Sequence, residues 1–387
     1  MVQMSIDASF HPGYGDQNNH VMNGDGFGVG WYHSNYFVDK THLLQNGYFQ
    51  KENEHPEKPL RLAAVFKDVL PAWNNLNLKE ICQATYSDCI MAHVRAASKG
   101  SGVSQQNCHP FKVGRLMFCH NGRIDSFLVL RRRYHALLSD EAFMGIRGTT
   151  DSEYIFALIL TILASDGKAD KSPLEQTAPF GHGRLMSALK KVLKMIEELQ
   201  VEAGMDGRFN TCNFSLTDGE TMVVTRYCDK SPSIPAPSLY FAYGEAQELY
   251  NELTDEDQPI AHESSLSSSH PSSVDFNKTY GKQKSSTGST GSTGSDVDDN
   301  NSQHSTEDEE SEDLERVKLK YALSTPGRIF ADIDPKMACM VVCSTPLTRT
   351  HSWHRIPANA ILYYTRGSFP ELRLLRSPEE KRLSVVA

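Results

Sequence analysis

Residues 116–164 of the chain read LMFCHNGRIDSFLVLRRRYHALLSDEAFMGIRGTTDSEYIFALILTILA. The stretch begins with the apolar run Leu116 to His120, which predicts a strand. It continues with apolar residues at helical spacing over Phe127 to Leu138 and Ser152 to Ala164. Thr150-Asp151-Ser152-Glu153 is a typical helix start, because it places acidic residues in the first turn. No repeating βαβ pattern surrounds these helices, which disfavours a doubly wound parallel fold.

Further strands are expected on both sides of these helices. Apolar runs predict strands at Phe27 to Tyr32, Cys89 to His93, Asn210 to Leu216, Thr221 to Arg226, Val317 to Tyr321, Ala338 to Val342 and Ala360 to Tyr364. A third helix is predicted over Gly183 to Ala203. Strands, then helices, then strands again indicate an α+β layered sandwich, with helices on the outer faces of two sheets.

The segment from Ala261 to Asp313 differs in composition from the rest of the chain. It is rich in Ser, Thr, Gly and acidic residues, and Val297 is the only large apolar residue between Tyr280 and Leu314. Such a segment buries too little apolar surface to offset its conformational entropy, so we expect it to be disordered. Because strand-like sequence resumes after it, residues 1–387 are predicted to form a single domain with a loop insertion at 261–313.

Composition excludes several classes of protein. The formal net charge of -9, with Arg131-Arg132-Arg133 as the one basic cluster, argues against nucleic-acid binding. The eight cysteines contain no CxxC pair, so neither a zinc knuckle nor a disulfide framework is indicated. No run is long and apolar enough to span a bilayer, and no signal peptide is evident. We therefore predict a cytoplasmic protein with no membrane partner.

Two short blocks combine glycine or arginine with a predicted strand. Asn23 to Trp31 contains four glycines and indicates a turn leading into a strand, and it matches neither common phosphate-loop motif. In His93-Val94-Arg95-Ala96-Ala97-Ser98, Arg95 stands at a strand end, where its guanidinium could bind a carboxylate through two hydrogen bonds. The alternative role for Arg95 is a structural salt bridge.

Two further blocks each allow a structural and a chemical interpretation. Asn107-Cys108-His109-Pro110-Phe111 leads through a strand into Cys119-His120-Asn121-Gly122. Asn121-Gly122 could form a hairpin turn, or an oxyanion hole from the Asn amide and the Gly backbone N–H. Asp151 could be a helix N-cap or could bind a substrate ammonium, and the two roles are compatible.

Taken in this order, the blocks resemble class II glutamine amidotransferases, which are N-terminal nucleophile hydrolases. The similarity is greatest to the fungal amidotransferase-like subunits of a glutathione-degrading complex. It rests on Met22 to Tyr32, Pro71 to Asn75, Asn107 to Phe111, Asn213 to Glu220 and Ser344 to Thr348. The resemblance implies a four-layer αββα sandwich, a γ-glutamyl substrate such as glutathione or glutamine, and a peptidase-like partner subunit. It implies no cofactor and no metal.

The resemblance also implies roles for individual residues. Arg95 would bind the α-carboxylate of the γ-glutamyl group, and Asp151 would bind its α-ammonium. Ser98 would occupy the position of the family's pocket threonine, and Asn121 and Gly122 would form the oxyanion hole. Pairing both charges of a zwitterion offsets the cost of removing them from water.

The nucleophile is where this sequence departs from the family. The family uses a cysteine at the mature N-terminus, with its own α-amine as base. Here Val2 follows Met1 and the first cysteine is Cys82, while Gln3 to Asp7 resembles a family segment that follows the first strand. We therefore expect this chain to lack the first strand of the fold. A missed first exon or a catalytically inactive protein would explain that.

Three functions follow as hypotheses. The first is γ-glutamyl amide hydrolysis, with glutathione as the favoured substrate. The second is a non-catalytic subunit that binds γ-glutamyl ligands or a partner protein. The third is a metal hydrolase that uses His93, His109 and His120, which is disfavoured because no HExxH motif or carboxylate cluster accompanies them. Cys108 and Cys119 are expected to be packed thiols, since residues adjacent to His109 and His120 in a strand point to opposite faces.

Overall fold

The computed structural model describes residues 5, 22–32, 62–97, 101–167, 172–173, 175–205, 209–231, 233–249, 333–347 and 353–375. The predicted insertion at 261–313 and the predicted strand at 317–321 lie outside these residues. Among the described residues, no helix has the length and apolar character needed to cross a bilayer.

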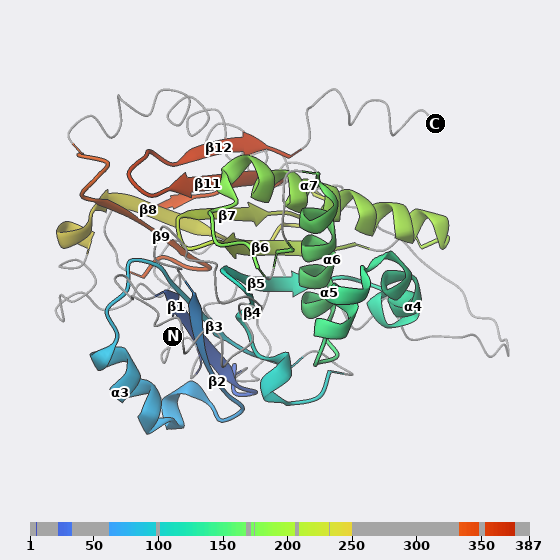
Figure 1. Ribbon diagram of the computed structural model, residues 1–387, viewed down its shortest axis with the longest axis horizontal. Coiled ribbons are helices and arrows are strands. Elements are labelled where there is room, and N and C mark those ends of the chain that lie inside the picture. The colour runs from blue at the N-terminus through green and yellow to red at the C-terminus, as the bar shows by residue number, and fades with distance from the viewer. Residues whose placement is uncertain are drawn as a thin grey trace, which may run out of the picture.

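The described residues form antiparallel sheets and a group of helices (Figure 1). The strands are β1 (Phe27–Tyr32), β2 (Ala63–Asp68), β3 (Ile90–Val94), β4 (Phe111–Val113), β5 (Leu116–Arg123), β6 (Thr211–Thr217), β7 (Thr221–Arg226), β8 (Tyr240–Glu245), β9 (Ala338–Cys343), β10 (Trp353–Arg355), β11 (Ala360–Thr365) and β12 (Glu371–Leu374). The helices are η2 (Ala72–Asn74), α3 (Leu76–Ala84), η3 (Gln105–Asn107), α4 (Phe127–Leu137), α5 (Asp140–Gly145), α6 (Asp151–Ser165) and α7 (Gly181–Glu202).

The central element is a six-stranded antiparallel sheet in the order β12-β11-β7-β6-β5-β4. Alternating side chains of β5 face opposite sides of this sheet, as the two-residue period of a strand requires. Leu116 and Phe118 belong to the core under the helices, whereas Met117 and Cys119 belong to a separate core on the other face. Each face of β5 therefore packs against a different layer.

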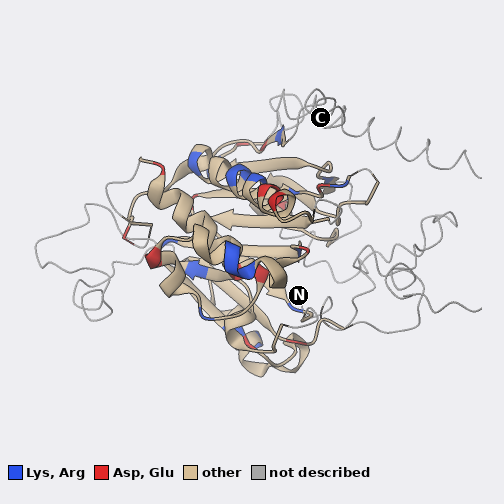
Figure 2. Cartoon of the chain, turned by 90° about the vertical axis from the view of Figure 1, so that its right-hand side faces the viewer, with Lys and Arg blue, Asp and Glu red and all other residues tan. Residues whose placement is uncertain are grey.

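The helical layer covers one face of the central sheet. In α6, eleven residues are buried, because this helix packs against both the sheet and its neighbouring helices. In α7 the residues that face the sheet are apolar, and its outer face carries charges such as the Lys194–Glu198 ion pair at 3.4 Å. Figure 2 looks onto this layer and shows basic and acidic residues close together on the helices.

Two three-stranded sheets, β2-β1-β3 and β10-β8-β9, pack against the other face of the central sheet. Gly30 in β1 allows a close approach, because a Cβ there would lie 2.4 Å from the Met117 sulfur. On the outer face of β2-β1-β3, Phe27 and Val29 pack against Ala72 of η2 and Leu78 of α3. The layers are thus helix, sheet, sheet and helix, which confirms the predicted α+β αββα sandwich.

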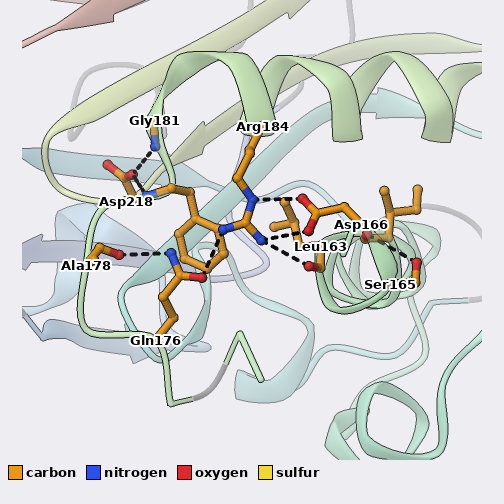
Figure 3. A network of polar contacts seen from close by, with 10 residues as sticks. Leu163, Ser165, Asp166, Gln176, Ala178, Gly181, Arg184 and Asp218 are labelled. Atoms are coloured by element: carbon orange, nitrogen blue, oxygen red, sulfur yellow. Dashed lines mark hydrogen bonds and ion pairs between the residues drawn. The ribbon is translucent and has the colours of Figure 1, made fainter. Parts of the chain in front are cut away.

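A partly buried polar cluster joins the end of α6 to the start of α7 (Figure 3). The Arg184 guanidinium donates to both carboxylate oxygens of Asp166, at 2.7 and 3.1 Å, and to the Leu163 carbonyl at 3.1 Å. Asp218 accepts from the backbone N–H of Phe180 at 2.7 Å, at the N-terminus of α7. These bonds satisfy helix-end groups that would otherwise be unpaired. They fix the C-terminal end of α6, whose N-terminal end carries Asp151.

Candidate functional site

Arg95 follows directly after β3, and its side chain is buried. Its backbone extends the pairing with the segment before β1, since Arg95 N donates to Gly26 O at 2.8 Å. The guanidinium Nη2 donates to Ser101 Oγ at 3.0 Å and to Gly102 O at 3.1 Å. Nη1 donates to Asp25 O at 3.4 Å. Only 4% of Arg95 is exposed, so the strand end at which it lies is buried.

The charge of Arg95 has no opposite charge paired with it in the described part of the chain. Its hydrogen-bond partners are a hydroxyl and two carbonyl oxygens, all neutral. A buried cation is costly unless a counter-charge compensates it. This environment favours an anionic ligand over the alternative of a structural salt bridge.

Asp151 is the first residue of α6, and the residue before it, Thr150, is the N-cap. The Thr150 hydroxyl accepts from Glu153 N at 3.3 Å, so the interpretation of Asp151 as the cap was wrong. Thr150 takes this role because its backbone is extended while Asp151 is already helical. The negative charge of Asp151 is favourable at this end of the helix dipole.

The Asp151 carboxylate connects α6 to the end of β5. Its Oδ2 accepts from Ile124 N at 2.8 Å, and its Oδ1 accepts from the N–H and the hydroxyl of Ser152 at 2.7 and 3.1 Å. A carboxylate has about four acceptor positions, so about one remains for a further donor. Among the described residues, Asp151 forms no ion pair, which leaves it available for an ammonium group.

Asn121 and Gly122 lie within β5 and not in a hairpin turn, which corrects that interpretation. Asn121 pairs with Asn213 and Gly122 with Cys212 in the β5–β6 ladder, so the strand continues past both residues. Gly122 has φ +153°, and a Cβ there would lie 1.9 Å from Thr211 O. Only glycine therefore fits at this position.

The Asn121 side chain points toward the sheet–sheet interface. Its Nδ2 donates to Ser344 Oγ at 3.3 Å, and Ser344 O in turn accepts from Ser238 Oγ at 2.6 Å. An amide nitrogen has two hydrogens, and no second partner of Asn121 Nδ2 occurs among the described residues. One N–H of this amide is thus available to a ligand oxygen.

A single side chain, Asn107, links the Arg95 segment with the Asp151 segment. Asn107 Nδ2 donates at 2.8 Å to Gly102 O, the same carbonyl that accepts from Arg95. Asn107 Oδ1 accepts from Thr149 N at 2.8 Å, two residues before Asp151. The candidate cation and the candidate anion therefore belong to one hydrogen-bonded framework.

Three buried or partly buried histidines lie between these segments. His93 Nδ1 lies 3.4 Å from His109 Nδ1, and His120 contacts Ser152 Oγ and Thr211 O, both at 3.0 Å. Burial lowers the pKa of His93 to about 3, and it also lowers the pKa values of His109 and His120. All three are neutral at pH 7. In the part of the chain that the structure describes, no three His, Cys, Asp or Glu side chains are grouped to hold a metal ion.

Cys108 and Cys119 are buried thiols, as expected. Cys108 Sγ donates to Ser104 O at 3.4 Å, and burial raises its pKa. Burial also raises the pKa of Cys119, which packs among apolar residues on the face opposite His120. Since the thiolate is the reactive form, neither side chain is an activated nucleophile.

A comparison with family models matches residues 2–260 to the class-II glutamine amidotransferases. The chain belongs to this family. The match spans the segments that carry Arg95, Asn107, Asn121, Gly122 and Asp151, and it ends before β9.

Among curated proteins, this amidotransferase-family chain is similar to the "Probable glutamine amidotransferase DUG3" of Saccharomyces cerevisiae. The identity is 37% over 226 residues, which cover 58% of this chain and 56% of the yeast protein. The chain thus spans little more than half of that relative's length.

Solved structures of two bacterial proteins are also similar. The class-II domain protein of Silicibacter pomeroyi is 26% identical, with a TM-score of 0.38 over 58% of this chain and 77% of that one. A predicted glutamine amidotransferase of Pseudomonas aeruginosa is 18% identical, with a TM-score of 0.31 over 61% of this chain and 70% of that one.

The amidotransferase motifs supplied the candidate residues, and the structure adds two contacts that the motifs did not indicate. Ser98 lies outside the described residues, so its pocket role stays a prediction. Asn107 and Ser344 both stand in blocks that carried the family resemblance, yet neither had been given a role. Their contacts join residues 42 and 223 positions apart, which no local pattern reveals.

Proposed function

We propose that this chain binds the γ-glutamyl group of glutathione or glutamine as a zwitterion, with its α-carboxylate on Arg95 and its α-ammonium on Asp151. The observation that supports this proposal most strongly is that neither Arg95 nor Asp151 forms an ion pair among the described residues. Arg95 is a buried guanidinium with neutral partners only, and Asp151 is a carboxylate with an acceptor position to spare. A ligand that supplies both opposite charges compensates both groups at once.

The proposed reaction at this site is hydrolysis of the γ-glutamyl amide. A nucleophile attacks the amide carbon, the C–N bond breaks, and water then releases glutamate from the acyl intermediate. The Asn121 amide, with its available N–H, and the Gly122 backbone N–H would stabilise the negative charge that develops on the carbonyl oxygen. Family membership and the similarity to a glutamine amidotransferase support this reaction class. Glutathione degradation with a peptidase-like partner is the setting we favour.

A second candidate function is γ-glutamyl binding without hydrolysis. The observation that favours it is the state of two thiols near the site, because burial raises the pKa values of both Cys108 and Cys119. In this form the polypeptide would act as a binding or regulatory subunit.

Two measurements test the proposed function. Calorimetric titration of the polypeptide with L-glutamine and glutathione should show binding of both, and D-glutamine should bind more weakly because its charges are exchanged in space. Glutamate release from glutathione should then be assayed for residues 1–387 and for a version that begins with Met-Cys from any upstream coding sequence. Release by the longer form alone supports the hydrolase, and release by neither supports the binding subunit. Absence of binding in both forms would refute the site.

A further inference from the structure

The side chain of Asn107, at the end of η3, is buried, and both of its polar atoms form hydrogen bonds. Only 2% of the residue is exposed. Nδ2 donates to Gly102 O at 2.8 Å and to Thr149 Oγ1 at 3.2 Å, and Oδ1 accepts from Thr149 N at 2.8 Å. Burying an amide is tolerated only when its polar atoms are satisfied, as they are here.

Each end of this connection leads to one charge of the candidate site. On one side, Gly102 O accepts from both Asn107 and the Arg95 guanidinium. On the other side, Thr149 is followed by the N-cap Thr150 and then by Asp151. Asn107 is therefore hydrogen-bonded to Gly102, whose carbonyl also contacts the Arg95 guanidinium, and to Thr149, which stands two residues before Asp151.

The fit around Asn107 leaves little room for the two segments to shift. A Cβ at Gly148 would lie 2.3 Å from Asn107 Oδ1 and 2.8 Å from Glu153 Oε2. The Glu153 carboxylate accepts from Arg147 N at 2.8 Å and Gly148 N at 2.6 Å, so α6 itself holds the turn that contacts Asn107. A satisfied buried network of this kind specifies one geometry.

We propose that Asn107 is a positioning residue that sets the separation between the Arg95 guanidinium and the Asp151 carboxylate, and so selects ligands with both charges of an α-amino acid. This inference rests on the proposed function of the site. A ligand that contacts both charges benefits from their fixed separation, because neither segment must be reordered when it binds. A ligand with one charge gains nothing from the separation.

The test compares three ligands that differ only in these charges. L-Glutamine carries both, glutaramate lacks the ammonium, and 4-aminobutyramide lacks the carboxylate. Calorimetry, with protein-detected NMR titration for the weak ligands, gives each affinity for the wild type and for Asn107→Ala. Loss of the buried bonds should weaken L-glutamine about 10- to 100-fold. The affinities for the two analogues should change by no more than about threefold, because each uses one charge only.

A second variant and a control separate positioning from general damage. Asn107→Asp retains the acceptor for Thr149 N and loses the donor to Gly102 O, so it should also weaken L-glutamine selectively and leave the affinities for the two single-charge analogues within about threefold. If Asn107→Ala does not fold, this near-isosteric variant alone decides the question.

The control is Asn359→Ala. Asn359 is also buried and accepts from a backbone N–H, that of Cys228 at 3.0 Å, but it lies beside β11, which β7 and β6 separate from β5. The control should lower thermal stability and leave all three affinities unchanged.

The outcomes distinguish this inference from the proposed function. Unchanged affinity of Asn107→Ala for L-glutamine, or an equal loss for all three ligands, overturns the positioning role while the site itself stands. If the wild type binds none of the three ligands, the proposed function fails first and the inference fails with it. Selective loss for L-glutamine supports both.

Discussion

At the scale of single residues, the proposed site depends on two charges, Arg95 and Asp151, that form no ion pair among the described residues. Arg95→Lys keeps the positive charge and removes the planar fork that can bind a carboxylate through two bonds. Asp151→Asn removes the negative charge with almost no change in shape. Each substitution should weaken binding of L-glutamine by about 2–5 kcal/mol, the usual cost of losing one partner of a desolvated charge pair. Calorimetric titration measures the loss, and thermal unfolding shows whether each variant still folds. Unchanged affinity in both variants would remove these residues from the site.

Sequence alone gave the candidate residues of the proposed site, but it did not indicate the residues whose contacts join their segments. Arg95, Asp151 and the Asn121-Gly122 pair stand in motifs in which residue type and order are informative. The local conformation of Asn121-Gly122 was mispredicted, because Asn-Gly is a common turn and the pairing of β5 with β6 overrides that preference. Asn107 and Ser344 form contacts across the fold, and such contacts leave no periodic signal in the chain.

At the scale of secondary structure, long apolar elements were predicted well and short ones were not. β1 and β7 match their predicted bounds, and α4, α6 and α7 differ from theirs by two residues or fewer at each end. The missed elements are β2, β4, β8, β10, β12, α3, α5 and the short helices η2 and η3. Most are short or lie at a sheet edge, as β2, β4, β10 and β12 do, and they are fixed by pairing or packing with distant residues more than by their own pattern.

The histidines between β3, η3 and β5 should make stability depend on pH. Burial and the neighbouring His93 hold the pKa of His109 well below its usual value near 6.5. Below that pH the unfolded chain takes up a proton that the folded chain does not. The contribution of this histidine to the free energy of unfolding is therefore largest above pH 6.5 and falls as the pH is lowered. At pH 5 one such histidine should cost about 2 kcal/mol.

Urea unfolding at pH 7 and pH 5 measures this effect. His109→Gln removes one of the groups, so the drop in unfolding free energy between the two pH values should be smaller by about 2 kcal/mol. The variant is compared with itself at the two pH values, so any loss of stability common to both cancels. A drop as large as that of the wild type would show that His109 is protonated in the folded protein.

At the scale of the whole molecule, the single-domain organisation stays a prediction, and one feature of the sheet supports it. β8 and β9 are neighbouring strands with six paired residues, from Tyr240↔Cys343 to Glu245↔Ala338. The tract at 261–313 lies between them in the sequence. Chain on both sides of the tract therefore builds one sheet, as expected for an insertion within a domain.

Replacing residues 261–313 with a short Gly/Ser linker should therefore leave folding intact. The tract has almost no large apolar residues, and shortening a flexible loop changes its closure entropy only slightly. Thermal unfolding should remain a single cooperative transition, with a midpoint within a few degrees of the parent. Loss of cooperativity would show that the tract belongs to the core.

The central claim is that one γ-glutamyl zwitterion occupies the space between Arg95 and Asp151, and a crystal structure with bound L-glutamine tests it most directly. The account predicts the α-carboxylate on the Arg95 guanidinium, the α-ammonium on the Asp151 carboxylate and the side-chain carbonyl oxygen on the Asn121 amide, all at hydrogen-bond distance. L-Glutamine bound elsewhere, or bound here with its charges on other residues, would contradict the account.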